Sequence, residues 1–250
     1  MFTTSTMVKG AALVAVTFFL ATQISFAHTT IKAQATEGVS DDNALKIGHG
    51  CETPDGESIP VVAQSVVFPT ITPQLSASDG SAISDLSEVI QQGSIAGLLK
   101  PLQDRNIFRS QSVKYDSLGN AIGFSATLGS LNTQTPGRVP FQFAAPNFVS
   151  SSCANRLLIK IAIADVCLLG ISQTDSLQAG KVNVWIPDNG TKYGSALGGF
   201  DGVGAPATLI VNRNLATNPL SPSCGAGVDV TVTPSVADIE SNLPIPDYWP

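Results

Sequence analysis

Short segments of alternating apolar and polar residues, separated by glycine- and proline-rich turns, make up most of this chain. Alternation puts successive side chains on opposite faces of a strand, and many short strands joined by such turns favour a β-sandwich. In 181–186 the alternation turns Trp185 away from the valines. Residues 157–166 form an apolar run, interrupted by Lys160 and Asp165, that suits a central strand. The other predicted strands are 28–33, 44–49, 61–68, 111–115, 120–128, 139–143, 207–211 and 228–232.

One segment departs from the strand pattern. Apolar residues recur at near-helical spacing from Ser84 to Leu99, Ser84 can cap the first turn, and Glu88 lies within that turn. Gly93 and Gly97 disfavour a long helix. We therefore expect one short helical insertion whose apolar stripe packs on the core of the sandwich.

The first two predicted strands bring the two histidines of the chain together. His28 begins the first strand, and His49 ends the second on the same face as Leu45 and Ile47. In an antiparallel hairpin, the start of the first strand lies beside the end of the second. We therefore expect His28 and His49 to be neighbours although they are far apart in sequence.

Residues 1–27 have the features of a secretory signal peptide. Lys9 is followed by the apolar run 11–20, and small residues occur at Ser25 and Ala27, just before a cleavage point. The apolar run is too short to cross a bilayer, which needs about 20 apolar residues. We expect a single mature domain, 28–250, that is periplasmic or secreted, has no membrane span and begins with His28.

All four cysteines, Cys51, Cys153, Cys167 and Cys224, lie in that mature chain. An even number of cysteines in an exported protein predicts two disulfides and leaves their pairing open. No CxxC pair is present, which argues against a zinc ribbon or a thioredoxin-like site.

The charge pattern excludes two classes of partner. The formal net charge is −6, charged residues make up 13% of the chain, and no basic stripe occurs in the sequence. Nucleic acid is therefore not an expected partner. The acidic balance likewise gives no reason to expect binding to anionic membranes.

A histidine at a free N-terminus can hold a metal through its α-amine and the δ nitrogen of its ring. Those groups have ordinary pKa values of about 8 and about 6.5, so little proton loss is needed near neutral pH. A second imidazole completes a T-shaped set of three nitrogens, which suits Cu(II). Both methionines precede residue 28, so the mature chain offers no thioether for Cu(I).

The second imidazole has a structural alternative. His49, between two glycines, could instead form a hydrogen bond in a tight turn beside a disulfide. A serine hydrolase is disfavoured because there is no G-x-S-x-G motif and one histidine is committed to the terminus. The carboxylates form no recognisable acid/base pair, so a glycosidase is also unsupported. Carboxylates near both histidines that could supply an oxygen ligand are Glu37, Asp41, Asp42, Glu52 and Glu57.

These motifs resemble the YcnI-like family of exported copper-binding domains. Its members begin with a histidine on a strand and reach a Gly-His-Gly-Cys cluster roughly twenty residues later. Three segments depart from the pattern: 70–110 looks inserted, Pro187 comes early, and the tail after Asp188 has no clear counterpart. The matching segments are His28–Ile31, Ile47–Cys51, Phe124–Leu128 with Pro136-Gly137, Lys160–Cys167 and Trp185–Pro187.

The resemblance implies an Ig-like β-sandwich that holds Cu(II) in a histidine brace with a tryptophan close to the metal. By this resemblance His28 carries the brace, Trp185 lies beside it, and Glu37 supplies a carboxylate ligand. It also implies the disulfides Cys51–Cys167 and Cys153–Cys224.

We therefore expect a non-enzymatic periplasmic Cu(II)-binding protein that acts in copper uptake, delivery or storage. Its partners would be the copper ion and a copper transporter or acceptor protein. One alternative is a copper-dependent polysaccharide monooxygenase, which also uses an N-terminal histidine brace. Against it, the second histidine usually lies much farther along such chains, and no flat aromatic face is evident. A second alternative is a structural or adhesive sandwich module without metal.

Overall fold

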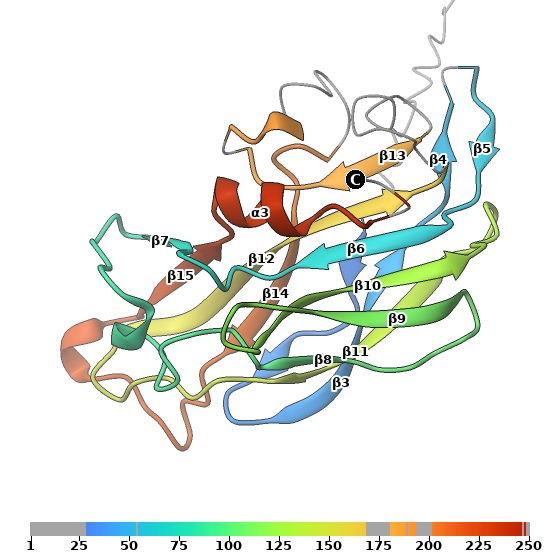
Figure 1. The fold of residues 1–250 in the computed structure, drawn as a ribbon. Coiled ribbons are helices and arrows are strands. Elements are labelled where there is room, and N and C mark those ends of the chain that lie inside the picture. The colour runs from blue at the N-terminus through green and yellow to red at the C-terminus, as the bar shows by residue number, and fades with distance from the viewer. Residues whose placement is uncertain are drawn as a thin grey trace, which may run out of the picture.

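The computed structural model describes residues 29–53, 55–168, 181–188, 190–193, 202–246 and 248, so the predicted signal peptide and His28 lie outside it. Most of the regular structure in these residues is β-strand (Figure 1). The strands are β1 (Thr30–Ile31), β2 (Ala35–Thr36), β3 (Ser40–Ile47), β4 (Cys51–Glu52), β5 (Ser58–Ile59), β6 (Ala63–Val67), β7 (Gln74–Ala77), β8 (Leu99–Pro101), β9 (Phe108–Tyr115), β10 (Ala121–Gly129), β11 (Gly137–Ala144), β12 (Ala154–Val166), β13 (Val182–Trp185), β14 (Ala207–Asn212) and β15 (Val228–Thr233).

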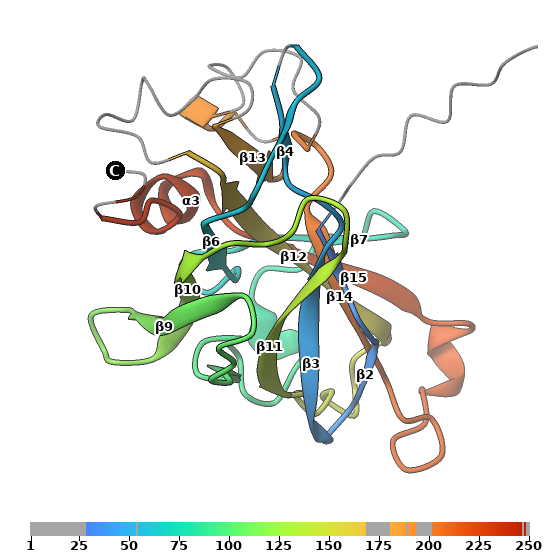
Figure 2. The same ribbon diagram turned by 90° about the vertical axis from the view of Figure 1, so that its right-hand side faces the viewer.

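Two sheets pack face to face and enclose the main core. The smaller sheet has the strand order β1-β3-β11-β8, and the larger has β2-β14-β12-β6-β10-β9 with β13, β15 and β7 attached. Figure 2 shows β3 and β11 in front of the strands of the larger sheet. Leu45, Phe141, Phe124 and Ile159 are among the buried side chains between the sheets. A short hairpin of β4 and β5 extends from one end.

Strand β12 joins both halves of the larger sheet. Its first half pairs with β14 and β15, and its second half pairs with β6 and β13. Ile161 and Ile163 face the main core, whereas Ala162 and Ala164 face a second apolar cluster on the other side of the sheet. Both faces of β12 are therefore buried, which explains its nearly continuous apolar sequence.

A C-terminal helix, α3 (Val236–Asn242), covers the second apolar cluster. The side chain of Ser235 accepts a hydrogen bond from the backbone N–H of Asp238 and so caps the helix. Ile239 and Leu243 are fully buried against the outer face of β6 and β12 (Figure 1). The sequence pattern did not predict this helix, because a helix of 7 residues is too short to show a clear helical repeat and it has few apolar positions.

The predicted fold class, an all-β sandwich stabilised by two disulfides, is confirmed. The apolar stripe between Ser84 and Leu99 is also buried in the core, as expected. The expected short helical insertion is present as one 3-10 turn, η1 (Leu86–Glu88), which is capped by Asp85 and not by Ser84. Gly93 and Gly97 have φ values of 65° and 80°, a left-handed conformation that ends a right-handed helix.

Both disulfides implied by the family resemblance are present. Cys51 pairs with Cys167 and Cys153 pairs with Cys224. A second 3-10 turn, η2 (Pro222–Cys224), leads into the latter bridge. Among the residues described, no helix is long and apolar enough to span a membrane.

Candidate metal centre

The predicted antiparallel pairing of the first two strands is confirmed, but the second strand ends at Ile47, so His49 lies in the loop after it and not at the strand end as expected. Strand β1 pairs antiparallel with β3, with Thr30 opposite Lys46 and Ile31 opposite Leu45. The start of β1 therefore lies beside the end of β3, where the chain continues into the loop that carries His49. His28 itself is outside the described residues, so its position relative to His49 stays a prediction.

Asp165 lies at the centre of a buried group of polar side chains. It faces the main core near the end of β12, opposite Gln64 on β6, and is 2% exposed. Its Oδ1 accepts a hydrogen bond from Gln64 Nε2 at 2.7 Å. Its Oδ2 accepts two more, from Thr29 Oγ1 at 2.7 Å and from Trp185 Nε1 at 2.8 Å. Four separate segments of the chain thus meet at one carboxylate.

The hydrogen bonds to this carboxylate do not fully offset the cost of burying its charge. Burial raises the pKa of Asp165, and the hydrogen bonds from Gln64, Thr29 and Trp185 oppose that rise without cancelling it. A carboxylate can accept about four hydrogen bonds, so one acceptor position remains, on Oδ1. The Oε1 atom of Gln64 is also buried and has no hydrogen-bond partner. A cation or a water molecule beside Oδ1 of Asp165 would give these two oxygen atoms the partner that they lack.

His49 lies in the loop between β3 and β4 and is half-buried. Its Nδ1 contacts the carbonyl oxygen of Gly50. Because a carbonyl can only accept, Nδ1 carries the proton, and Nε2 keeps a lone pair in the neutral ring. The positive form of His49 lowers the pKa of Asp165, so the two groups interact electrostatically.

The Cys51–Cys167 disulfide connects the two chain segments that carry these groups. Cys51 follows His49 by two residues, and Cys167 follows Asp165 by two residues. The backbone N–H of Cys51 also contacts Sγ of Cys167 at 3.1 Å. A side chain at Gly50 would place its Cβ 2.0 Å from the carbonyl oxygen of Ile59, so only glycine permits this close approach.

The structure does not bring Glu37 to this centre. Glu37 lies in the turn before β3, whereas His49 follows the other end of that strand, which is about 25 Å long. Its Oε1 accepts hydrogen bonds from the Phe148 N–H at 2.7 Å and from Asn218 Nδ2 at 2.6 Å. Its Oε2 accepts one from the Asn214 N–H at 2.9 Å. Glu37 therefore holds three loops together and is not available to a metal near His49.

Asp165 is the residue that the sequence interpretation missed. It appeared there as an interruption of an apolar run, although a charged residue inside such a run is costly to bury and calls for a partner. The predicted neighbour Trp185 does lie in the group, because its indole N–H binds Asp165.

The described residues contain no set of three histidine, cysteine, aspartate or glutamate side chains that could hold a metal alone. His49 and Asp165 supply two donors, one nitrogen and one oxygen. A metal centre at this place would need further donors besides these two.

No protein-family model matches this chain, and no curated protein matches it either. A solved structure of an uncharacterized protein from Nocardia farcinica, described as having an immunoglobulin-like fold, resembles it with a TM-score of 0.38. The two are 10% identical, and the match covers 75% of this chain and 98% of that one. At this level of similarity the comparison bears on neither site nor activity.

Proposed function

We propose that the mature protein binds Cu(II) outside the cytoplasm, in a centre made by His28, His49 and Asp165 beside Trp185. One observation carries this proposal: the hydroxyl of Thr29 donates to the buried carboxylate of Asp165. Thr29 is joined covalently to His28, and consecutive Cα atoms are about 3.8 Å apart. The terminal amine that cleavage would create is thus tethered next to an uncompensated buried carboxylate.

The donors fit the metal. The amine and Nδ1 of His28 supply two nitrogens, and Nε2 of His49 supplies a third. Asp165 contributes negative charge and one open acceptor position on Oδ1. Nitrogen and carboxylate donors suit Cu(II), and a bound dication offsets the charge that burial disfavours. Trp185 closes the centre from the side of β13 and holds Oδ2 in place.

The role that we infer is binding and transfer of copper rather than catalysis. Such a protein would serve copper uptake, delivery or storage and would exchange the ion with a transporter or acceptor. Its two disulfides are typical of proteins that fold in an oxidising compartment such as the periplasm or the extracellular space.

Electron paramagnetic resonance of the cleaved protein tests the centre. Cu(II) added to protein that begins at His28 is expected to give a type 2 spectrum with nitrogen coupling. A glycine placed ahead of His28 replaces the amine by an amide and is expected to abolish that spectrum. If the spectrum survives this extension, the terminal chelate is wrong.

Two further measurements define the centre. His49→Ala is expected to remove one nitrogen coupling, and an unchanged spectrum would make His49 structural. The copper form, given reductant, peroxide and chitin or cellulose, is expected to release no oxidised sugars. Their release would favour the monooxygenase instead.

A further inference from the structure

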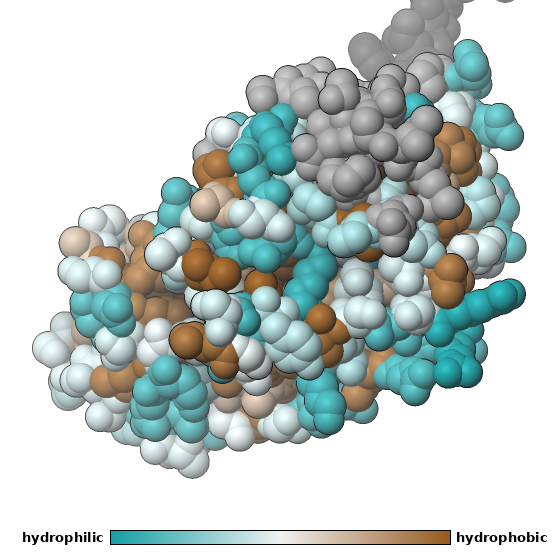
Figure 3. Space-filling model, in the orientation of Figure 1, coloured by the Kyte–Doolittle hydropathy of each residue, from teal (hydrophilic) through white to brown (hydrophobic). Residues whose placement is uncertain are grey.

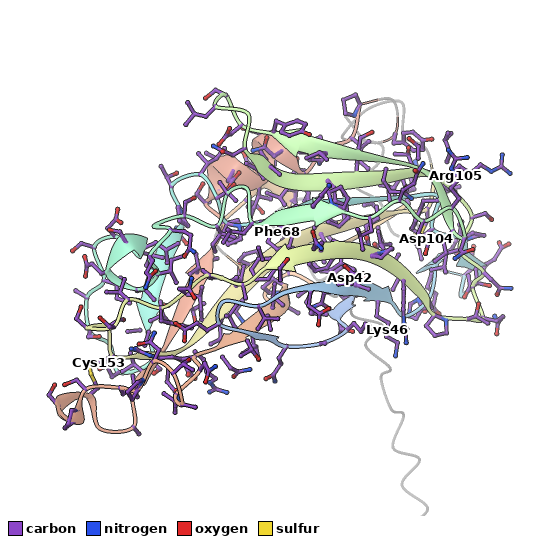
Figure 4. All side chains as sticks on the ribbon, turned by 90° about the horizontal axis from the view of Figure 1, so that it is seen from below. Asp42, Lys46, Phe68, Asp104, Arg105 and Cys153 are labelled. Atoms are coloured by element: carbon purple, nitrogen blue, oxygen red, sulfur yellow. A yellow bond between two sulfur atoms is a disulfide. The ribbon has the colours of Figure 1, made fainter. Side chains whose placement is uncertain are left out.

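The solvent face of the smaller sheet gathers cations that are scattered in the sequence. Leu45 and Val139 are buried in the main core, so their neighbours Lys46 and Arg138 point to solvent. The strand register places Lys46 directly opposite Arg138. Figure 4 views the molecule from the side of β3 and labels Lys46 on that strand.

Two more cations complete this surface. The backbone N–H of Lys32 binds the carbonyl of Ala44, which continues the register of β1 and β3. Ala44 is two residues from the outward-facing Lys46, so Lys32 lies on the same solvent side of the sheet. Lys100 on β8 lies opposite Gln142 on β11. All four cations are exposed. We call the set Lys32, Lys46, Lys100 and Arg138 the basic face.

The basic face is not neutralised by the protein itself. Within the described parts of the chain, the ion pair found is Arg156–Asp229, and neither residue belongs to this face. Like charges directly opposite each other on neighbouring strands repel. Asp42 lies within this face, because it is opposite Gln142 on β11, which in turn is opposite Lys100 on β8. The face therefore holds four cations and this one strand carboxylate. The face is therefore a local excess of positive charge on a chain whose net charge is −6.

We propose that the basic face is the docking surface for an acidic patch on a partner protein. Its four cations span roughly 14 Å along and across the strands. That area is far below the ~800 Å² that each side of a stable complex buries, so the contact is weak and transient. Among the described residues, none of the exposed large apolar side chains lies on this face. Figure 3 shows another face of the molecule, on which apolar residues are scattered among polar ones. Charge therefore drives the docking.

The occupant is a protein rather than an anionic bilayer. A bilayer extends well past a patch of this size, so it would also meet the rest of a chain whose net charge is −6, whereas the attraction of the four cations is screened beyond the Debye length of about 8 Å. A partner protein can present its negative charge to the four cations alone.

The position of the face ties it to the candidate metal centre. Thr30 lies opposite Lys46, and it follows Thr29, whose hydroxyl binds Asp165. His49 comes three residues after Lys46. A partner docked here is thus placed beside the centre. The role of this partner as a copper donor or acceptor rests on the proposed function, whereas the docking does not.

The test uses metal-free mature protein and a deca-glutamate peptide as a minimal acidic surface. In ¹⁵N-labelled protein, the peptide is expected to shift amide signals of β3, β8 and β11, with an affinity that falls as salt is added. The double variant Lys46→Gln/Arg138→Gln is expected to weaken binding about tenfold. The matched control, Lys160→Gln/Arg109→Gln, loses the same lysine and arginine charges from the larger sheet and is expected to bind normally.

Several results would overturn the docking surface. Equal weakening in both double variants would show that only net charge matters. Binding to vesicles with about 30% phosphatidylglycerol but not to the peptide would make a bilayer the occupant. Salt-dependent self-association of the mature protein, lost in Lys46→Gln/Arg138→Gln, would make it a second copy. The same double variant is expected to keep the Cu(II) spectrum, so a failure of docking leaves the proposed function standing.

Discussion

Burial and hydrogen bonding have opposite effects on the charge of Asp165. Its carboxylate is buried, and three hydrogen bonds stabilise its negative charge. Burial still raises its pKa, so the charge remains unfavourable for folding. Residues kept in such a state are typical of binding sites, where a ligand supplies the missing partner.

The substitution Asp165→Asn separates binding from folding. It removes the charge with almost no change in shape, so the metal-free protein is expected to unfold at an equal or higher urea concentration. Its Cu(II) affinity, measured by calorimetry, is expected to fall at least about tenfold because the compensating charge is lost. Glu37→Gln is the matched control: it lies at the other end of β3 and is expected to lower stability without changing copper affinity. Unchanged copper affinity in Asp165→Asn together with weakened affinity in Glu37→Gln would show that Asp165 is not part of the copper centre.

At the scale of elements, the two disulfides have different neighbours. Cys51–Cys167 links the loop of His49 to the end of β12, while Cys153–Cys224 lies near the start of β12. Figure 4 shows Cys153 at the opposite end of the molecule from Lys46. Each bridge closes a long loop, and removal of either is expected to cost roughly 2–5 kcal/mol of stability.

The disulfides therefore offer a matched pair of variants. Cys51→Ala/Cys167→Ala and Cys153→Ala/Cys224→Ala are both expected to lower the melting temperature. Only the first is expected to change the Cu(II) spectrum and weaken affinity, because it releases the segments that carry His49 and Asp165. Calorimetry and electron paramagnetic resonance at a temperature where both variants are folded check this. A normal copper centre without Cys51–Cys167 would show that the bridge does not position the ligands.

Helix α3 is anchored by a half-buried lysine from β9. Nζ of Lys114 donates to Ser65 Oγ at 2.6 Å, to the Pro244 carbonyl at 3.3 Å, and to the carbonyl of Asn242. Burial lowers the pKa of Lys114 to about 7, from 10.5. Between these two values the unfolded chain binds more protons than the folded one, so stability rises with pH.

We expect the free energy of unfolding to increase from about pH 7 to about pH 9, by at most ~1.4 kcal/mol per pH unit from this lysine. The pH range ends at about 9 because tyrosine begins to ionise above it in the unfolded chain. Burial raises the pKa of Tyr193 in the folded protein, so its ionisation would lower the stability and mask the effect of Lys114. Urea unfolding at several pH values measures the slope. Lys114→Met is expected to flatten it, and an unchanged slope in that variant would assign the effect to other groups.

The sequence predicted the strands better than the site because strands leave a local signal. Alternation located β3, β10 and β11, and the apolar run located β12, since these patterns follow directly from which faces are buried. The centre at Asp165 depends on four segments that only the sheet register brings together. The basic face could not be predicted for the same reason: three of its cations lie on β3, β8 and β11, Lys32 follows β1, and the four form no run in the sequence.

At the scale of the whole molecule, the proposed centre spans both sheets. Thr29 precedes β1 of the smaller sheet, whereas Asp165 and Trp185 belong to β12 and β13 of the larger one. A metal bound there would tie the two layers together at one end of the sandwich. Copper binding is therefore expected to raise the stability of the whole domain against unfolding, and not only to order a loop.

Thermal unfolding tests this coupling. Free Cu(II) at a hundred times its dissociation constant is expected to stabilise the mature protein by about 2.7 kcal/mol. For a domain of this size that raises the melting temperature by about 5–10 °C. In a chain that retains Ala27, the α-nitrogen of His28 is a peptide amide and no longer an amine, so the shift is expected to be much smaller. Lys46→Gln/Arg138→Gln should keep the full shift, because the basic face supplies no ligand. Equal shifts with and without Ala27 would place copper elsewhere on the molecule.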